Sequence, residues 1–96
     1  MKKIYVVGSS NTDMIVKCGH LPKPGETVVG GTFFQANGGK GANQAVATAR
    51  LGGQTVFFCQ IGHDAFGRQS LSAYQKEGID TQYIQTHNEQ ASGIAL

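Results

Sequence analysis

The sequence predicts an α/β fold built on a mostly parallel sheet, and three observations support this class. Short apolar runs rich in β-branched residues alternate with segments of helical periodicity along the 96 residues. Glycines, fourteen in all, stand at the ends of many of these segments. The hydrophobic content of 40% is ordinary for a globular protein, and the length suits one domain at most.

The first part of the chain is predicted to contain a strand, a loop and a projecting hairpin. Residues 2–8 form an apolar run that ends at a glycine, which is typical of a buried strand entering a loop, here SSNTD at 9–13. Residues 14–20 and 27–35 are two further extended pieces. Between them, Pro24-Gly25 suits the two central positions of a type II turn. Strands joined by such a turn predict a hairpin that stands apart from the main layer.

Two helices alternate with strands in the rest of the chain. The first helix is predicted from Ala42 to Leu51, with small residues on one face and Gly52-Gly53 to end it. The second lies within residues 63–78, where Asp64 is a better candidate for an N-cap than for a catalytic acid, and Gly78 ends the helix. The remaining strand-like segments are residues 55–62, 81–87 and 92–96.

Composition argues against several classes of partner. The net charge of +2 is too small to indicate binding to nucleic acid or to an anionic membrane surface. Few apolar residues precede Gly8, too few for a signal peptide or a membrane span, so a cytoplasmic protein is expected. Cys18 and Cys59 lie far apart, with no C-x-x-C motif and no histidine at metal-ligand spacing, and are predicted to be buried, reduced thiols.

A glycine-rich block precedes the first predicted helix. Gly38–Asn43 holds three glycines, a lysine and an asparagine, and a helix N-terminus offers free N–H groups, which together suit an oxygen-rich or anionic small molecule. The block is not a Walker A loop, because Phe34 and Gly41 occupy positions that need glycine and Ser or Thr. It is not a dinucleotide fingerprint either, because Gln44 stands where the pattern needs its last glycine.

Two further polar residues follow the first predicted strand. Asn11 and Asp13 lie just beyond its carboxyl end, where open α/β sheets place their ligand crevices. Taken alone, they are more simply explained as a solvated turn, because Asn and Asp readily form such turns. Together with Gly39, Lys40 and Asn43 they offer a carboxylate, amides and a charged donor, which suit a polyol with vicinal hydroxyls. The residues therefore favour a sugar site.

Four segments carry a more specific likeness. GSSNTD, PKPGET, NGGKGANQAVATARLG and IGHDAFGRQSL, in this order and spacing, closely resemble the N-terminal third of the ribokinase-like (PfkB) carbohydrate kinases. The resemblance covers essentially the whole chain. It implies a three-layer α/β/α, Rossmann-like body with a small β-sheet lid, which would comprise about residues 14–29 and 92–96 and would also form a homodimer contact. Residues 1–96 are thus expected to be an N-terminal fragment of one such domain.

The resemblance also implies a reaction and a set of binding residues. Asn11 and Asp13 match the family's sugar-binding Asn and Asp, and Gly39, Lys40 and Asn43 match its second sugar-binding cluster. The implied reaction transfers the γ-phosphoryl group of ATP to the 5-hydroxyl of D-ribose, with Mg²⁺ on the phosphates and a monovalent cation such as K⁺ as activator. The family's catalytic base is an aspartate in a glycine-rich segment that these 96 residues lack, so the chain alone is expected to be inactive.

Two alternatives stay open at this point. The first is another sugar kinase of the same family, acting on deoxyribose or fructose. The second is a non-catalytic module that binds sugar or dimerises through the edge of the lid hairpin. Substrate panels separate the first alternative from a ribose kinase, because a site that hydrogen-bonds a particular hydroxyl rejects an analogue that lacks it by about 10⁴-fold.

Overall fold

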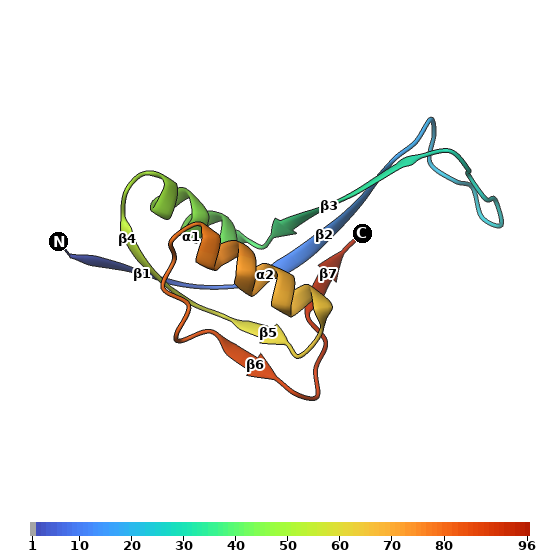
Figure 1. Ribbon diagram of the computed structural model, residues 1–96. Coiled ribbons are helices and arrows are strands. Elements are labelled where there is room, and N and C mark those ends of the chain that lie inside the picture. Colours follow the sequence, from blue (N-terminus) through green and yellow to red (C-terminus); the bar gives the residue numbers. More distant parts are fainter. Residues whose placement is uncertain (1) are drawn as a thin grey trace.

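The computed structural model describes residues 2–96, which form two helices and seven strands (Figure 1). The elements in chain order are β1 (Lys3–Val7), β2 (Asn11–Lys17), β3 (Thr32–Gly38), α1 (Lys40–Arg50), β4 (Gln54–Phe58), β5 (Gln60–Gly62), α2 (Ala65–Lys76), β6 (Gln85–His87) and β7 (Gly93–Ala95). The predicted α/β class is confirmed.

The main layer consists of parallel strands. β1 pairs with β4 from Lys3 opposite Gln54 to Val7 opposite Phe58. Further along the chain, β5 pairs with β6 in the same parallel sense. An isolated parallel bridge between Val56 and Asp80 links β4 to the segment that follows α2. Parallel pairing of this kind requires the crossover connections that α1 and α2 provide.

The helices cover one face of this layer. The buried cluster there comprises Val6 and Phe57 from the strands, Ala42 and Ala45 from α1, Tyr74 from α2, and Ile79. The rings of Phe57 and Tyr74 meet edge to face, with centroids 5.4 Å apart and planes at 81°, a geometry that adds about 0.5–1.5 kcal/mol beyond burial of the area. Because both helices share one face, residues 2–96 supply two of the three layers expected for the body.

The other three strands form a separate sheet, called here the hairpin sheet. Its strand order is β3-β2-β7, with β2 antiparallel to β3 and parallel to β7. In Figure 1 the connection between β2 and β3 projects far from the helices, as predicted for the hairpin. The projection raises the radius of gyration to 15.8 Å, compared with about 12–13 Å for a compact domain of this length.

The turn between β2 and β3 is the predicted type II turn. The amide of Glu26 donates to the carbonyl of Lys23 at 2.9 Å, which closes the four-residue turn. Gly25 has a φ of 78°, the positive value that the third position of this turn type requires.

Helix boundaries agree closely with the sequence pattern. α1 begins at Lys40, two residues earlier than predicted, and Gly52 follows its end with a φ of 91°. α2 begins after Asp64, whose carboxylate accepts a hydrogen bond from the amide of Gly67 at 2.8 Å. The N-cap predicted for Asp64 is therefore confirmed.

The predicted loop over residues 9–13 is wrong at its second half. β2 begins at Asn11, so Asn11 and Asp13 lie in a strand and not in a turn. The reason is that β2 pairs along both edges, with Gly38 on one side of Asn11 and Gly93 on the other. These ladder bonds outweigh the local preference of Asn and Asp for turns.

The third extended piece also needs correction. β3 covers Thr32–Gly38 instead of residues 27–35, because Gly30, with a φ of 89°, interrupts the extended chain. The range of 14–29 expected for the lid contains most of β2 but none of β3, which is the other arm of the hairpin.

Two strands in the second half are shorter than predicted. The expected strand over 55–62 is interrupted at Cys59, where the pairing changes from β1 to β6. The expected strand over 81–87 is reduced to β6, because a local turn precedes it. In that turn Asp80 Oδ1 accepts from the amide of Gln82 at 3.1 Å, and the amide of Ile84 donates to the carbonyl of Thr81 at 3.0 Å.

The two cysteines differ from each other. Both are free thiols, but Cys18 is exposed on the hairpin, so the prediction of burial is wrong for it. Cys59 lies against the core, and burial raises the pKa of its thiol to about 11. Among the described residues, neither helix has the length and apolar character needed to cross a membrane.

Candidate functional site

Asn11 and Asp13 occupy the same face of β2. They are alternate residues of one strand, so their side chains point to the same side of the hairpin sheet. Both are partly buried, while Thr12 between them points to the opposite face and is buried. The strand therefore aims one amide and one carboxylate in a common direction.

A glycine on a neighbouring strand lies beside each of these side chains. A Cβ atom added to Gly38 of β3 would lie 2.5 and 2.6 Å from the two carboxylate oxygens of Asp13. A Cβ atom added to Gly93 of β7 would lie 2.6 Å from Oδ1 of Asn11. Real Cβ atoms do not approach so closely, so a side chain at either glycine would force the Asp13 carboxylate or the Asn11 amide to move.

The turn from β3 into α1 lies next to the same strand. Gly39 takes a φ of 97°, and a Cβ atom there would meet the carbonyl oxygen of Ser9 at 2.7 Å. The amide of Ala42 donates to that same carbonyl at 2.9 Å, and the amide of Asn43 donates to the carbonyl of Gly39 at 2.9 Å. These contacts hold the start of α1 against the residues that lead into β2.

The N-terminus of α1 keeps its positive electrostatic character. It has no side-chain cap, and its first turn carries no acidic residue. Lys40, the first residue of the helix, adds an exposed ammonium group. β2 and the adjoining start of α1 therefore carry one carboxylate, two amides and a cationic helix end, which are groups that bind hydroxyl and phosphate oxygens.

The predicted polar side chains form no hydrogen bonds or ion pairs among the described residues. Within residues 2–96, none of the hydrogen bonds and ion pairs involves the side chains of Asn11, Asp13, Lys40 or Asn43. The same described residues contain no group of three His, Cys, Asp or Glu side chains that could hold a metal ion.

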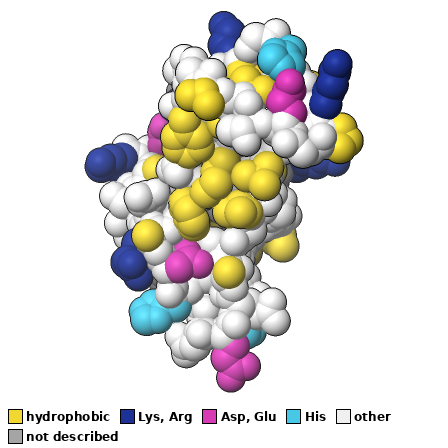
Figure 2. Space-filling model, turned by 90° about the vertical axis from the view of Figure 1, so that its right-hand side faces the viewer, with side chains coloured by type: hydrophobic (Ala, Val, Ile, Leu, Met, Phe, Trp, Pro, Cys, Tyr) yellow, Lys and Arg dark blue, Asp and Glu magenta, His cyan; other side chains and the backbone are white. Residues whose placement is uncertain are grey.

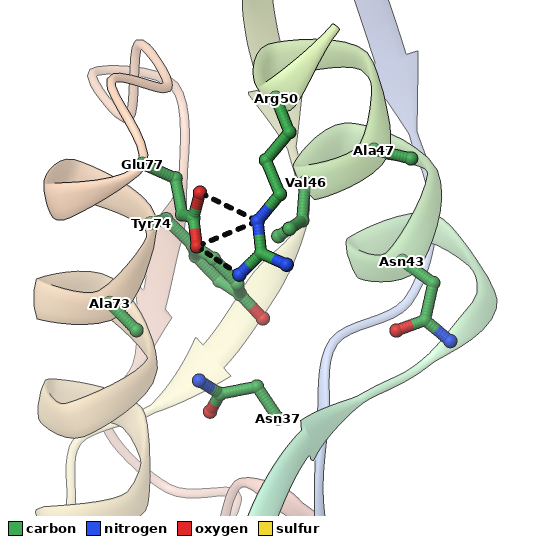
Figure 3. A pocket seen from close by; sticks show the side chains of 8 residues that line it. All are labelled: Asn37, Asn43, Val46, Ala47, Arg50, Ala73, Tyr74 and Glu77. Carbon is green, nitrogen blue, oxygen red and sulfur yellow. Dashed lines mark hydrogen bonds and ion pairs between the residues drawn. The ribbon is translucent and has the colours of Figure 1, made fainter.

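Asn43 also borders a cavity between the two helices, shown in Figure 3. The cavity has a volume of about 480 Å³. Its lining residues are Asn37, Asn43, Val46, Ala47, Arg50, Ala73, Tyr74 and Glu77. Asn43 is the one predicted site residue in this lining. Asn11, Asp13, Gly39 and Lys40 lie outside it, so the cavity and the predicted site share only one residue.

An ion pair spans this cavity from helix to helix. Arg50 donates from Nε to both carboxylate oxygens of Glu77, at 3.0 and 3.2 Å, and from Nη2 to Oε1 at 2.5 Å. The bidentate contact lowers the pKa of Glu77 and raises the pKa of Arg50, chiefly through the hydrogen bonds and then through the opposite charge. It joins the C-terminal ends of α1 and α2.

Residues that the sequence did not single out anchor the site. The hydroxyl groups of Ser10 and Tyr74 are hydrogen-bonded in the interior, and Ser70 donates to Oδ1 of Asn37 at 3.3 Å. Burial is the main cause of a raised pKa for Tyr74, which keeps the phenol neutral. Ser10 immediately precedes β2, and Asn37 immediately precedes Gly38 in β3. Through these two hydrogen bonds α2 is attached to both strands.

Sequence reasoning missed Gly38, Gly93, Ser10 and Tyr74. Gly38 opens the glycine-rich block and could have been included on that basis. The other three carry no local signal, because their importance depends on contacts between distant parts of the chain.

Comparisons with known proteins show the family of the chain. Residues 1–96 match the pfkB family of carbohydrate kinases. The chain is 45% identical over 95 residues to the ribokinase of Haemophilus influenzae, covering 99% of this chain and 31% of that protein. It is 37% identical over 92 residues to the deoxyribokinase of Salmonella typhi, covering 96% of this chain and 30% of that protein.

A solved structure gives the same result for the fold. The Arabidopsis thaliana ribokinase complexed with ribose and ATP superposes with a TM-score of 0.86 at 37% identity, covering 96% of this chain and 30% of the solved chain. The chain therefore spans about a third of the length of the relatives that it matches. On the match over its full length and on the shared fold, the chain belongs to the pfkB family of carbohydrate kinases.

Proposed function

We propose that these residues form the sugar-binding part of an ATP-dependent carbohydrate kinase that phosphorylates the 5-hydroxyl of D-ribose. The observation that carries this proposal is the placement of Asn11 and Asp13 on one face of β2, each beside a glycine of a neighbouring strand. The turn at Gly39 and Lys40 adjoins them. A polar surface of this kind suits the hydroxyl-bearing face of a sugar ring.

Each side chain has a defined task in this proposal. The carboxylate of Asp13 accepts hydrogen bonds from two adjacent ring hydroxyls, which a single carboxylate can do with its two oxygens. Asn11 and Asn43 both donate and accept, so they orient hydroxyls without a charge. Lys40 supplies a charged donor, and hydrogen bonds to charged groups are stronger than neutral ones. Together they would hold the sugar in one orientation for phosphoryl transfer.

The nucleotide and the catalytic base lie outside these residues in our proposal. The Arabidopsis relative is a complex with both ribose and ATP, and 70% of its chain lies beyond the part matched here. We assign ATP, Mg²⁺, a monovalent cation such as K⁺ and the catalytic aspartate to that remainder. Phosphoryl transfer depends mainly on positioning and on charge stabilisation, and residues 2–96 would supply the positioning of the acceptor. Because the donor is ATP, we place the reaction in the cytoplasm.

A second copy of the chain is the proposed partner. The hairpin sheet carries an apolar groove of about 440 Å³, lined by Met14, Val16, Cys18, Leu21, Pro22, Val28, Phe33 and Leu96. Figure 2 shows hydrophobic side chains gathered on this side of the molecule. Clusters of this kind often mark protein interfaces. The antiparallel hairpin also offers a strand edge for pairing, so we propose a homodimer formed through this lid.

Deoxyribose is the alternative acceptor that a specific observation favours. The Salmonella deoxyribokinase matches nearly the whole chain at 37% identity. A site that hydrogen-bonds the 2-hydroxyl discriminates strongly against the sugar that lacks it.

The test uses the full-length protein encoded by the reading frame that contains these residues. ADP release is measured with ATP and Mg²⁺ against ribose, deoxyribose, fructose and no sugar. Turnover with ribose that collapses in Asp13→Asn supports the proposal, whereas turnover with another sugar alone overturns the choice of ribose. Absence of turnover with every sugar would favour a non-catalytic binding module. As a further arm, purified residues 1–96 should release no ADP.

A further inference from the structure

The carboxylate of Asp64 joins two segments that are distant in the chain. Its Oδ1 accepts from the amide of Gly67 at 2.8 Å and from the hydroxyl of Ser92 at 2.7 Å. Its Oδ2 accepts from the amide of Ser92 at 2.8 Å. The hydroxyl oxygen of Ser92 in turn accepts from the amide of Gly62 at 2.8 Å. One side chain therefore fixes both the start of α2 and a residue 28 positions later.

Ser92 immediately precedes β7, and β7 lies beside the candidate sugar site. Its first residue, Gly93, pairs with Asn11 in the parallel ladder. Glycine leaves no spare room for a side chain there, since a Cβ atom on Gly93 would lie 2.6 Å from Oδ1 of Asn11. A shift of Gly93 of a few tenths of an ångström would therefore alter the surface against which the Asn11 amide rests.

We propose that Asp64 is a positioning residue for the sugar site: by holding Ser92, it fixes β7 against Asn11 and sets the orientation of the Asn11 amide. This inference rests on the proposed function of Asn11 in binding sugar. Asp64 does not itself contact the sugar. It acts through its hydrogen bonds to Ser92, the peptide bond from Ser92 to Gly93, and the pairing of Gly93 with Asn11.

Capping alone does not account for the arrangement at Asp64. An N-cap needs one oxygen, which accepts an amide of the first helical turn. At Asp64 the second oxygen, Oδ2, accepts only the amide of Ser92, and Oδ1 accepts the Ser92 hydroxyl in addition to the capping amide. The hydrogen bonds from Ser92 and Gly67 also lower the pKa of Asp64, so the carboxylate stays charged, and stays an acceptor, at neutral pH.

Variants of the full-length protein can separate the capping of α2 by Asp64 from its hold on Ser92. Asp64→Ser keeps an N-cap, because serine is among the preferred cap residues, but it is too short to hold both groups of Ser92. Ser92→Ala removes the hydroxyl from the other side. Asp80→Ser is the matched control, because Asp80 also accepts an amide, that of Gln82 at 3.1 Å, but lies in the turn after α2.

The experiment combines kinetics, thermal unfolding and amide hydrogen exchange. Asp64→Ser and Ser92→Ala are expected to raise the KM for ribose about tenfold, since a misplacement of under 1 Å can cost up to about 10²-fold, while the KM for ATP stays unchanged. Amide exchange should accelerate in residues 92–96 and 11–13 but not in α1. Asp80→Ser should leave the KM for ribose, the KM for ATP and the amide exchange close to those of the wild type.

The outcomes separate this inference from the proposed function. If exchange in residues 92–96 and 11–13 is unchanged in both variants, Asp64 does not hold β7 and the inference is wrong, whatever the kinetics. A rise in exchange without a rise in the ribose KM would also overturn it, because β7 would then not orient Asn11. If the wild type phosphorylates no sugar, the proposed function fails, and hydrogen exchange alone decides whether Asp64 orders Asn11.

Discussion

Ser10 and Tyr74 lie 64 residues apart in the sequence, and their hydroxyl groups are hydrogen-bonded inside the protein. Ser10 is 8% exposed and Tyr74 is 1% exposed. The bond connects the residue before β2 to the second helix. Since β2 carries Asn11 and Asp13, the candidate sugar site is attached to the core through this pair.

Removal of the Tyr74 hydroxyl should therefore destabilise the protein. Tyr74→Phe leaves the Ser10 hydroxyl buried without its partner, which costs about 1–3 kcal/mol. The free energy of unfolding, measured by urea titration of the full-length protein, should fall by this amount. Tyr83→Phe is the control, because Tyr83 is about half exposed and should show little change. Equal stability of the two variants would contradict the prediction.

Gly38→Ala should damage sugar binding without loss of the fold. The new methyl group would lie 2.5 Å from the Asp13 carboxylate, so that carboxylate must move. We expect the kcat/KM for the sugar to fall by about 10²-fold with no change in the KM for ATP. Gly19→Ala is the matched control, because nothing lies within 4 Å of a Cβ atom there. Unchanged sugar kinetics in Gly38→Ala would exclude a role for this glycine.

Val16→Asp should weaken the proposed homodimer. Val16 lines the apolar groove of the hairpin sheet and is 60% exposed, so a charge there would be buried on association. Light scattering after size-exclusion chromatography should show a shift from dimer to monomer. Val29→Asp is the control, since Val29 is 88% exposed and lies outside the lining of the groove. A dimer that persists in Val16→Asp would place the interface elsewhere.

The Arg50–Glu77 pair should contribute to stability at neutral pH and fade in acid. The hydrogen bonds that Arg50 donates lower the pKa of the Glu77 carboxyl. Glu77 therefore binds a proton less readily in the folded state than in the unfolded state, where the pKa of a glutamate is about 4.3. The contribution is complete above that value and is lost as the pH falls through the lowered pKa. Because the pair lies at the surface, with the Arg50 side chain 67% exposed, the effect should be small.

The measurement is the melting temperature of Glu77→Gln against the wild type across pH. The variant should melt lower at pH 7, and the difference should shrink in acid. Glu89→Gln serves as the control, because Glu89 forms no ion pair within residues 2–96. A difference that grows in acid would reverse the sign and refute the assignment.

Local patterns in the sequence were sufficient to predict the helices, the type II turn and the N-cap at Asp64. Each depends on residues a few positions apart, as in the turn closed by Lys23 and Glu26. The order of strands and helices follows for the same reason, because hydrophobic periodicity is a local property. The five predicted site residues came from short motifs as well, and their role in binding stays a prediction.

Features that depend on distant partners could not be predicted in this way. Asn11 looks like a turn residue until β3 and β7 pair with it from both sides. The clamp of Asp64 on Ser92 and the bond between Ser10 and Tyr74 likewise join segments that have no common local signal. In each case tertiary hydrogen bonds decide the outcome.

The alternation of side chains along β2 separates two tasks within one strand. Odd-numbered positions 11 and 13 face the candidate ligand, and even-numbered positions 14 and 16 face the apolar groove. Under the proposed function, point substitutions could therefore change assembly and substrate choice independently. A single-residue insertion or deletion within this strand would exchange the two faces. The strand should tolerate many substitutions and almost no change of length.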